Sequence, residues 1–267
     1  MNDKTKQQIM QNRELLKGYG SWDVGEEATD EEQKLPYLPP LKGKMVKNSI
    51  PIPLYFEDIV NEKNIFELLQ ERKSRRTFSE KAVTQKQLSF LLWATQGVRR
   101  FAGKQRQVTF RNVASAGSRH PFETYLFLNH VEGMPKGLYH YLPAGHELEC
   151  VEQRADYEEE LSQALCDQKF AAAAPVVFIW SAIPYRTEWR YGMKAAKYIL
   201  MDAGHVCENL YLACEAAGCG TCAIGAYDQE SLDELLGFGP GPSAETDYEC
   251  AVYVAAVGRQ KEEETKE

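Results

Sequence analysis

A run of four cations surrounds one hydroxyl near the start of the predicted regular structure. Arg72, Lys73, Arg75 and Arg76 flank Ser74 at the expected end of a helix. Cations at a helix C-terminus interact favourably with the helix dipole, so one interpretation is a solvated helix end. The other is an anion-binding site, because the planar guanidinium of arginine donates hydrogen bonds in a geometry that matches phosphate.

Small residues follow one another in a loop that leads directly into a predicted strand. Ser115, Ala116, Gly117 and Ser118 precede Arg119 there, with His120 and Pro121 next in the chain. Small side chains let backbone N–H groups approach a ligand closely. The same composition suits a loop that only needs tight turns, whereas the hydroxyls and the neighbouring cation favour a polar, phosphate-bearing or heteroaromatic ligand.

A C-x-x-C motif, Cys219 to Cys222, lies inside the glycine-rich stretch from residue 218 to 225. A reactive dithiol needs its first cysteine at a helix N-terminus, where the dipole lowers the thiol pKa, but Cys219 follows a predicted helix C-terminus. The sequence has no second paired-cysteine motif to complete a tetrahedral metal site. We therefore expect neither a redox dithiol nor a metal centre.

Two further features carry polar chemistry. Arg259 and Lys261 come directly after the last predicted strand, where the chain end either closes over an anion or forms a solvated basic tail. His205 lies in the middle of a long predicted helix, and we expect it to be a hydrogen-bonded core residue and not a catalyst.

Capping residues and apolar periodicity predict the helices that must position these segments. Capping boxes at Asn64 and Thr84 open helices that end near Lys73 and before Gly97, and a third box, Ser231 with Glu234, opens another. A helix is predicted for residues 157–166. Apolar residues at a period of about 3.6 predict the longest helix for residues 192–217, with Gly218 placed to cap its end.

Branched and aromatic residues predict the strands. Residues 124–129 and 138–141 read as an antiparallel pair, because glycine and proline separate them. The continuous apolar run 176–180 predicts a strand buried on both faces. Short and final strands follow at 221–225 and 248–257. Strands interrupted by long helices, without regular alternation and without a glycine fingerprint, favour an α+β fold over a doubly wound one.

The first sixty residues lack sustained periodicity and contain five prolines between residues 36 and 53. We interpret residues 1–60 as an extended N-terminal arm and residues 61–267 as one main domain. The composition also suits disorder, but apolar residues such as Leu35, Tyr37 and Ile52 give the arm anchors that would lie along a partner subunit.

Composition excludes several function classes. The net charge of −8 argues against nucleic acid, whose phosphates are bound by surplus lysine and arginine. No apolar run approaches the roughly 20 residues needed to span a bilayer, and the polar start lacks a signal-peptide core. The seven cysteines are scattered and odd in number, which favours a reducing compartment. We expect a cytoplasmic protein with no membrane or nucleic-acid partner.

Taken in order, the four segments resemble the nitroreductase family of flavoproteins: a basic-Ser-basic motif, a serine-rich loop before a strand, a glycine-rich turn after a long helix, and a terminal basic pair. The match covers about residues 62–261. Within the family the chain is most similar to the azoline dehydrogenase-like, or SagB-type, branch. That likeness is carried by Ser115-Ala116-Gly117, His120-Pro121, Arg190-Tyr191-Gly192, Tyr198, Asp202-Ala203-Gly204-His205 and Asn209-Leu210.

The resemblance implies a nitroreductase fold with a central antiparallel sheet flanked by helices, in an intertwined homodimer. It also implies two FMN sites at the subunit interface, NADH or NADPH as the electron donor, and a small-molecule substrate. The implied FMN-binding residues are Arg72, Lys73, Ser74, Arg76, Ser115, Ala116, Gly117, Ser118, Ile224, Gly225, Ala226, Arg259 and Lys261.

Particular roles follow from the same resemblance. Arg72 and Ser74, with Arg259 and Lys261, would bind the phosphate end of FMN, and Arg76 would lie near the pyrimidine edge. Residues 115–118 would line the flavin ring from the partner subunit. The backbone N–H of Gly225, with that of Ala226, would donate to flavin N5.

One departure affects the implied chemistry. Azoline-oxidising members carry a Lys-Tyr pair proposed to act as base, whereas this chain has Arg190-Tyr191. Arginine stays protonated at any working pH and is a poor base, so azole formation is not expected. Tyr191 and His120 remain the candidates for proton transfer.

Three functions compete. The first is an FMN-dependent oxidoreductase that transfers hydride between NAD(P)H and a small organic substrate by a ping-pong mechanism. The second keeps the flavin but cleaves a cofactor or removes a halogen substituent. The third is a non-catalytic flavin-binding subunit of a peptide-modifying complex.

Overall fold

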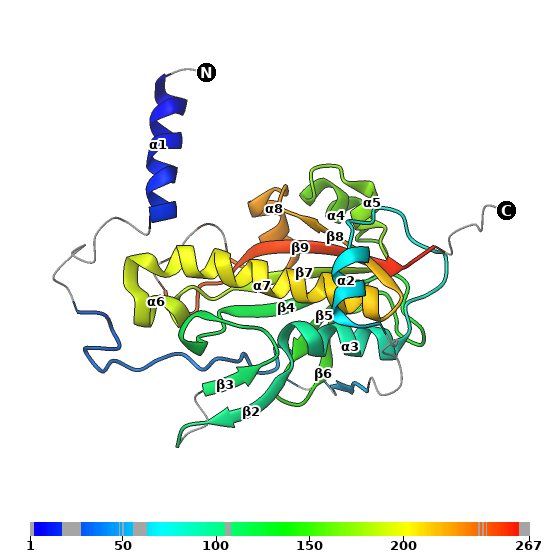
Figure 1. The fold of residues 1–267 in the computed structure, drawn as a ribbon, viewed down its shortest axis with the longest axis horizontal. Helices are drawn as coiled ribbons and strands as arrows, with labels where there is room; N and C mark the ends of the chain where they lie inside the picture. Colours follow the sequence, from blue (N-terminus) through cyan, green and yellow to red (C-terminus); the bar gives the residue numbers. More distant parts are fainter. Residues whose placement is uncertain are drawn as a thin grey trace.

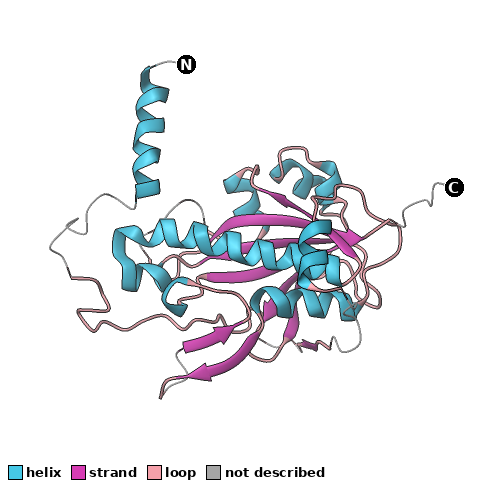
Figure 2. Cartoon of the chain, in the orientation of Figure 1, coloured by secondary structure: helices cyan, strands magenta, loops and turns pink. Residues whose placement is uncertain are grey.

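The computed structural model describes residues 3–17, 28–47, 49, 51–55, 63–104, 108–239, 241, 243 and 245–261. Seven strands form one sheet in the order β1-β6-β5-β4-β7-β9-β8, and every neighbouring pair is antiparallel. Helices lie on both faces of this sheet (Figures 1 and 2). The predicted α+β class with a central antiparallel sheet is confirmed.

The strands of the main sheet include all those predicted, within a few residues at each end. They are β1 (Ile52–Pro53), β4 (Phe122–Leu128), β5 (Gly137–Leu142), β6 (Glu147–Glu152), β7 (Val176–Ala182), β8 (Cys219–Ile224) and β9 (Cys250–Arg259). β4 and β5 pair antiparallel, as predicted. All seven residues of β7 are buried, and β7 lies between β4 and β9, so the prediction of a strand buried on both faces is also confirmed.

Most of the helices of the described residues pack on one face of the sheet or the other. They are α1 (Asp3–Lys17), α2 (Ile65–Glu71), α3 (Gln85–Gln96), α4 (Glu158–Ala164), α5 (Lys169–Ala172), α6 (Tyr185–Tyr191), α7 (Ala195–Ala216) and α8 (Gln229–Leu235), with 3₁₀ turns η1 (Ala116–Ser118) and η2 (Gly192–Lys194). The capping boxes at Asn64 and Thr84 are present, so the starts of α2 and α3 are as predicted.

Alternating residues of the central strands form two cores. Leu126 and Phe178 face α3 and α7 in one core, whereas Tyr125 and Ile179 face α4, α5 and α8 in the other. This alternation follows from the two-residue period of a strand. The long helix α7 therefore lies against the face that also carries α3.

Two predicted helix starts are wrong. α8 begins at Gln229, because Asp228, and not Ser231, is the N-cap: its carboxylate accepts the backbone N–H of Ser231 at 2.9 Å. The long helix begins at Ala195 because Gly192 has a φ of 49° and starts a 3₁₀ turn. Gly218, with a φ of 67°, follows the helix end as predicted.

Several elements were not predicted. The strands β2 (Val98–Ala102) and β3 (Val108–Arg111) form a separate two-stranded sheet that projects beside the main sheet (Figure 1). The sequence did not predict β2 because it contains two charged residues, Arg99 and Arg100, whose side chains are exposed. β1, β6, α5 and α6 were also missed.

The sequence predicted an extended arm for residues 1–60, but part of this segment is helical. Its first described residues form α1, which projects from the main body in Figure 1 and meets α7 near its own C-terminal end, where Lys197 Nζ donates to the Leu16 carbonyl at 2.7 Å. The part from residue 28 to 55 lies against its own chain: the Glu149 carboxylate accepts the backbone N–H groups of Met45 and Val46 at 2.7 and 3.0 Å. The proposed boundary at residue 60 lies outside the described residues, and contact with a partner subunit stays a prediction.

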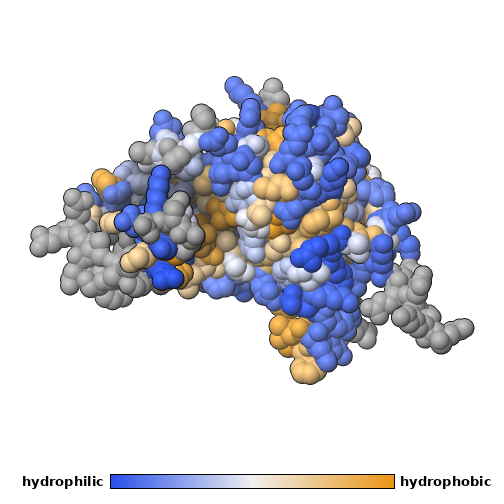
Figure 3. Space-filling view, turned by 90° about the horizontal axis from the view of Figure 1, so that it is seen from above, coloured by the Kyte–Doolittle hydropathy of each residue, from blue (hydrophilic) through white to orange (hydrophobic). Residues whose placement is uncertain are grey.

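Some large apolar side chains are exposed on the helices. On α2 these are Ile65, Phe66 and Leu69, and on α7 they are Leu200 and Met201. The face seen in Figure 3 likewise carries hydrophobic residues among hydrophilic ones. Among the described residues, no helix combines the length and the apolar character that crossing a membrane requires.

Candidate functional site

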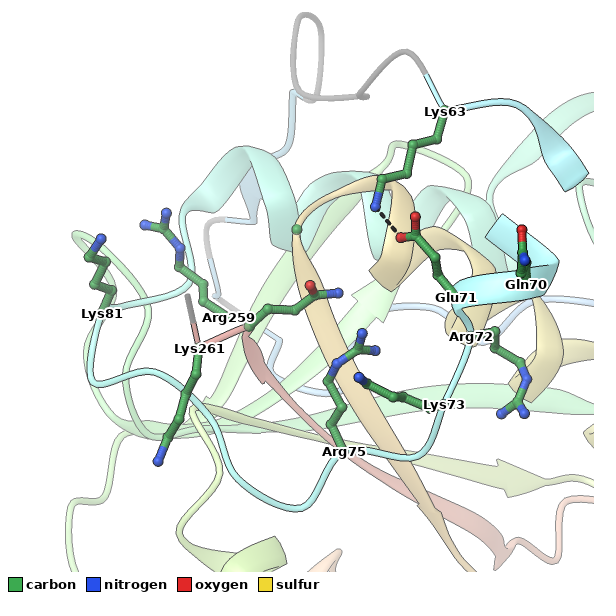
Figure 4. A pocket seen from close by; sticks show the side chains of 11 residues that line it. Lys63, Gln70, Glu71, Arg72, Lys73, Arg75, Lys81, Arg259 and Lys261 are labelled. Carbon is green, nitrogen blue, oxygen red and sulfur yellow. Dashed lines mark hydrogen bonds and ion pairs between the residues drawn. The ribbon is translucent and has the colours of Figure 1, made fainter. Parts of the chain in front are cut away.

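A strongly cationic cavity lies where the segment after α2 meets the ends of β8 and β9. Its volume is about 750 Å³, and it is lined by Lys63, Gln70, Glu71, Arg72, Lys73, Arg75, Lys81, Gly218, Arg259, Gln260 and Lys261. Seven of these eleven residues are lysine or arginine, and one is acidic. Figure 4 shows that the cations come from segments far apart in the sequence. The predicted meeting of the first and fourth segments therefore occurs.

Backbone hydrogen bonds attach the segment after α2 to the sheet. The Arg75 N–H donates to the Thr221 carbonyl at 2.9 Å, and the Ser79 N–H donates to the Arg259 carbonyl at 2.9 Å. Two glycines permit this approach. A Cβ at Gly258 would lie 2.5 Å from the Phe78 ring, and one at Gly220 would lie 2.5 Å from Arg75 Cδ.

Two carboxylates reduce the positive charge at the rim of the cavity. Glu71 pairs with Lys63, and the buried Glu215 pairs with Arg75. Arg75 is thereby fixed against α7. Among the described residues, no carboxylate forms an ion pair with Arg72, Arg259 or Lys261, so these are the cations best suited to an external anion.

Ser74 is predicted to bind phosphate but does not line the cavity. Its hydroxyl forms a hydrogen bond of 2.8 Å with that of Tyr211, which also accepts the Ala223 N–H at 2.9 Å. The Arg72 guanidinium lies 5.3 Å from the Tyr211 ring centroid. Tyr211 thus links the first segment, β8 and α7. Sequence reasoning missed it, although a tyrosine within the apolar repeat of α7 was the available signal.

The serine-rich loop lies elsewhere, near the first turns of α7. The Asp202 carboxylate accepts the Ala116 N–H at 3.1 Å, and Ser118 Oγ donates to the Thr109 carbonyl at 2.9 Å. Asp202 and Tyr211 are nine positions apart on α7, which corresponds to about 13 Å along a helix. Within one chain, therefore, the loop does not line the cationic cavity.

His120 is buried directly beyond this loop, with 4% of its surface exposed. Burial, and then the positive charge of Arg111, lower the pKa of His120 to about 2. Its backbone N–H donates to Ser115 Oγ at 2.9 Å, and its backbone has a φ of 47°. A histidine with so low a pKa is a weak proton acceptor at neutral pH.

Tyr191, the other candidate for proton transfer, lies against the loop. A Cβ at Gly117 would lie 2.6 Å from the Tyr191 hydroxyl and 3.1 Å from Arg190 Cδ. The Tyr191 ring packs on that of Tyr198, with centroids 4.6 Å apart. The structure therefore brings together the Arg190-Tyr191 motif and the Ser115-Ala116-Gly117 motif.

The remaining predicted residues follow β8. Ile224 is the last residue of that strand and is buried, whereas Gly225 and Ala226 are exposed. Apart from Gly225 and its two chain neighbours, no atom of the described residues lies within 4 Å of the position that a Cβ on Gly225 would take. The Gly225 backbone is accordingly open to a ligand. Arg76 is exposed, and its charge lowers the pKa of Cys222, although burial raises it overall.

The cysteine and histidine predictions have different outcomes. Burial raises the pKa of Cys219 to about 12, and positions three apart on a strand point to opposite faces, so the C-x-x-C motif is not a reactive dithiol. No group of three potential metal ligands occurs within the described part of the chain. His205 was expected in the core, but its side chain is 51% exposed because it faces outward from α7.

Comparisons with known proteins identify the family. The nitroreductase family model matches residues 69–258. A protein of Methanocaldococcus jannaschii, provisionally named a nitroreductase, is 33% identical over 177 residues, which are 66% of this chain and 86% of that protein.

Solved structures share the fold. A provisionally named nitroreductase of Ralstonia eutropha matches with a TM-score of 0.59 and 27% identity over 85% of this chain and all of its own. One from Anabaena variabilis has a TM-score of 0.59 and 23% identity over 79% of this chain, which spans only 41% of that protein. A chain of the E. coli microcin synthetase McbBCD complex has a TM-score of 0.56 and 15% identity over 98% of this chain and 95% of its own.

The family model covers more than two thirds of the chain, and the matched region contains the first three of the four segments and ends directly before the terminal basic pair. The cationic cavity, the loop and the Gly225 backbone all belong to this region or adjoin it. The chain belongs to the nitroreductase family of oxidoreductases.

Proposed function

We propose that this chain is an FMN-dependent oxidoreductase that transfers hydride between NADH or NADPH and a small organic substrate by a ping-pong mechanism. One observation carries the proposal: Arg72, Arg259 and Lys261 meet at a single cavity of about 750 Å³. Guanidinium groups match the oxygen atoms of a phosphate, and a cavity of this size takes the phosphate end of a nucleotide-like cofactor.

The residues present fit FMN in their chemistry. The cavity offers cations for a phosphate, and Gly225 is exposed and has open space where a side chain would stand, which lets a ligand approach its backbone. When bound, FMN would supply the reversible two-electron chemistry that protein side chains lack. Arg72, Lys73, Arg259 and Lys261 would hold the phosphate, and the charge of Arg76 would favour the anionic reduced state. Ser74 would act through Tyr211 by fixing the segment.

A homodimer completes this proposed site. In one chain the serine-rich loop is held at Asp202 of α7, and Tyr211, which neighbours Arg72, lies nine positions or about 13 Å further along that helix. Residues Ser115, Ala116, Gly117 and Ser118 would therefore contribute to the cofactor site of the partner subunit. The exposed apolar residues of α7, Leu200 and Met201, suit burial between two copies.

We also propose that the chain belongs to the SagB-type branch. The motifs that carry this likeness, Ser115-Ala116-Gly117 and Arg190-Tyr191, touch one another, as residues of a shared site should. Arg190 in place of lysine removes the base, so we propose reduction or dehydrogenation of a small molecule and not azole formation. Tyr191 is then the group that exchanges a proton with the substrate, because His120 is too weak a base.

The proposal is tested by reconstituting the purified protein with FMN and adding NADH or NADPH without oxygen. The expected result is loss of the visible flavin absorbance, followed by its recovery when a nitroaromatic, a quinone or an enone is added. A protein that binds no FMN, or whose bound FMN is reduced by neither nicotinamide, would contradict the proposal.

A further inference from the structure

Two arginines lie next to each other beside the serine-rich loop. The Arg119 guanidinium lies 5.2 Å from the centroid of the Trp189 ring, and Arg190 follows Trp189 on α6. Arg119 Nε is buried and has no hydrogen-bond partner among the described residues. Burial, and then the charge of Arg190, lower the pKa of Arg119. Two neighbouring cations, one of them incompletely hydrogen-bonded, favour an anion between them.

This arginine pair adjoins the proposed reaction site. Arg190 Cδ lies 3.1 Å, and the Tyr191 hydroxyl 2.6 Å, from the point that a Cβ on Gly117 would occupy. Tyr191 therefore offers a hydroxyl beside the two positive charges. A ligand held by the arginines would lie against the loop that we assign to the flavin ring.

One carboxylate, that of Glu31, faces the pair from the N-terminal segment. Its Oε2 atom lies 3.3 Å from Arg190 Nε, and its charge also acts on Arg119. The Glu31 backbone N–H donates to the Trp189 carbonyl at 2.8 Å, and Trp189 Nε1 donates to the Leu35 carbonyl at 2.9 Å. These bonds fix the segment on α6, close to which it runs in Figure 1.

The ion pair between Glu31 and Arg190 is open to exchange. The Arg190 and Glu31 side chains are 42% and 36% exposed. Exposed pairs of this kind contribute little to stability, because water screens them. A second carboxylate that makes more hydrogen bonds with Arg119 and Arg190 can therefore replace Glu31 without unfolding the segment.

We propose that Arg119 and Arg190 form a recognition site for the carboxylate of the substrate, and that Glu31 occupies this site when the substrate is absent. The substrate class is accordingly an organic carboxylate. The proposal rests on the proposed function, because it takes residues 115–118 as part of the flavin site. The N-terminal segment then has a role within its own chain, as an internal competitor.

The test uses benzoate and its uncharged analogue benzamide as probes of the full-length, FMN-loaded protein. Binding is followed by the change in flavin absorbance and by calorimetry. The variants are Arg190→Gln, Arg119→Gln and Glu31→Gln. Arg154→Gln is the matched control, because Arg154 pairs with Asp156 and Glu160 near α4, away from the loop.

We expect benzoate to bind at least about tenfold more tightly than benzamide, since only the carboxylate makes charge-assisted hydrogen bonds. Arg190→Gln and Arg119→Gln should each weaken benzoate binding about tenfold, and Glu31→Gln should strengthen it several-fold by removing the competitor. Arg154→Gln should have no effect. Benzamide affinity should be the same in all variants.

Equal affinity for benzoate and benzamide, or benzoate binding that neither Arg190→Gln nor Glu31→Gln alters, would overturn the proposal. Failure of the proposed function is distinguishable from this result. A protein that takes up no FMN would refute the flavoenzyme, whereas calorimetry of benzoate with the flavin-free protein would still decide whether the arginine pair binds a carboxylate.

Discussion

The cationic cavity and the loop region differ in what determines their chemistry: positive charge in the cavity, and the burial of a single histidine in the loop region. In the cavity, cations from residues 72–75 and 259–261 are brought together from segments distant in the sequence. In the loop region, which comprises residues 115–120 with Arg190 and Tyr191, burial differs from residue to residue: the Arg190 side chain is 42% exposed, whereas His120 is almost completely enclosed, and burial lowers its pKa to about 2.

The difference shows what residue types reveal before the fold is known. A dense group of arginines and lysines indicates an anion site wherever it remains partly exposed, because the ordinary pKa values of both side chains lie far above neutral pH. A histidine changes its role with its surroundings, because burial can remove its proton affinity. The cavity can therefore be altered through charge and close packing, and the loop region through burial and protonation.

The largest expected effect concerns the close packing that builds the cavity. Gly258→Val should lower the free energy of unfolding by about 3 kcal/mol and abolish FMN binding, since the new Cβ would lie 2.5 Å from the Phe78 ring. Urea unfolding measures this. Gly43→Ala is the control, because nothing lies within 4 Å of its Cβ position. If a second change, Phe78→Ala, partly restored the free energy of unfolding, the clash with the Phe78 ring would be identified as the cause. A Gly258→Val protein as stable as the unaltered one would refute the clash.

The next effect separates the two regions by charge. Arg259→Gln should weaken FMN binding by about 10- to 100-fold, because a phosphate loses a charge-assisted donor. Arg190→Gln should change FMN affinity by less than about threefold, since its role lies with the substrate. Fluorescence titration with FMN measures both. Equal losses in the two variants would remove the distinction between the regions.

Much of the cavity could be predicted because its residues occur in short, local signals. The capping box at Asn64 fixes the start of α2 and hence where Arg72 emerges, and Gly218 marks the turn between α7 and β8. The first five residues of β7, 176–180, are an uninterrupted apolar run, so the central place of this strand was also predictable.

The loop region could not be predicted in the same way. Its surroundings come from contacts between residues distant in the sequence, such as Ala116 with Asp202 and Trp189 with Leu35. The buried cation that acts on His120 is Arg111 of β3. The sequence predicted neither β3 nor its charged hairpin partner β2 as a strand. No local pattern shows that His120 would lie among these groups.

The pH dependence of stability tests the burial of His120. The folded protein holds its pKa at about 2, below the ordinary value of 6.5, so the unfolded chain alone takes up the proton as the pH falls below 6.5. Stability from this residue is present above pH 6.5 and should fall by about 2 kcal/mol between pH 7 and pH 5. Urea unfolding at both values should show that His120→Gln loses less stability over this interval than the unaltered protein. Parallel losses would mean that His120 is accessible.

The smallest expected effect concerns the link between the cavity and α7. Tyr211→Phe removes the hydroxyl that accepts the Ala223 N–H and bonds to Ser74, and should cost about 1 kcal/mol of unfolding free energy. Tyr55→Phe, at a position 71% exposed, is the matched control and should be neutral. Thermal unfolding of both variants measures the difference. If Tyr211→Phe were as stable as the control, Tyr211 would not support the segment.

Comparing FMN with riboflavin tests most directly whether the cationic cavity recognises a phosphate. Riboflavin has the same ring system but lacks the phosphate. Titration of the unaltered protein with each, followed by flavin fluorescence, should give an affinity for FMN at least about 100-fold higher, and Arg259→Gln should reduce this ratio. Equal affinities for the two flavins, or binding of neither, would contradict the account.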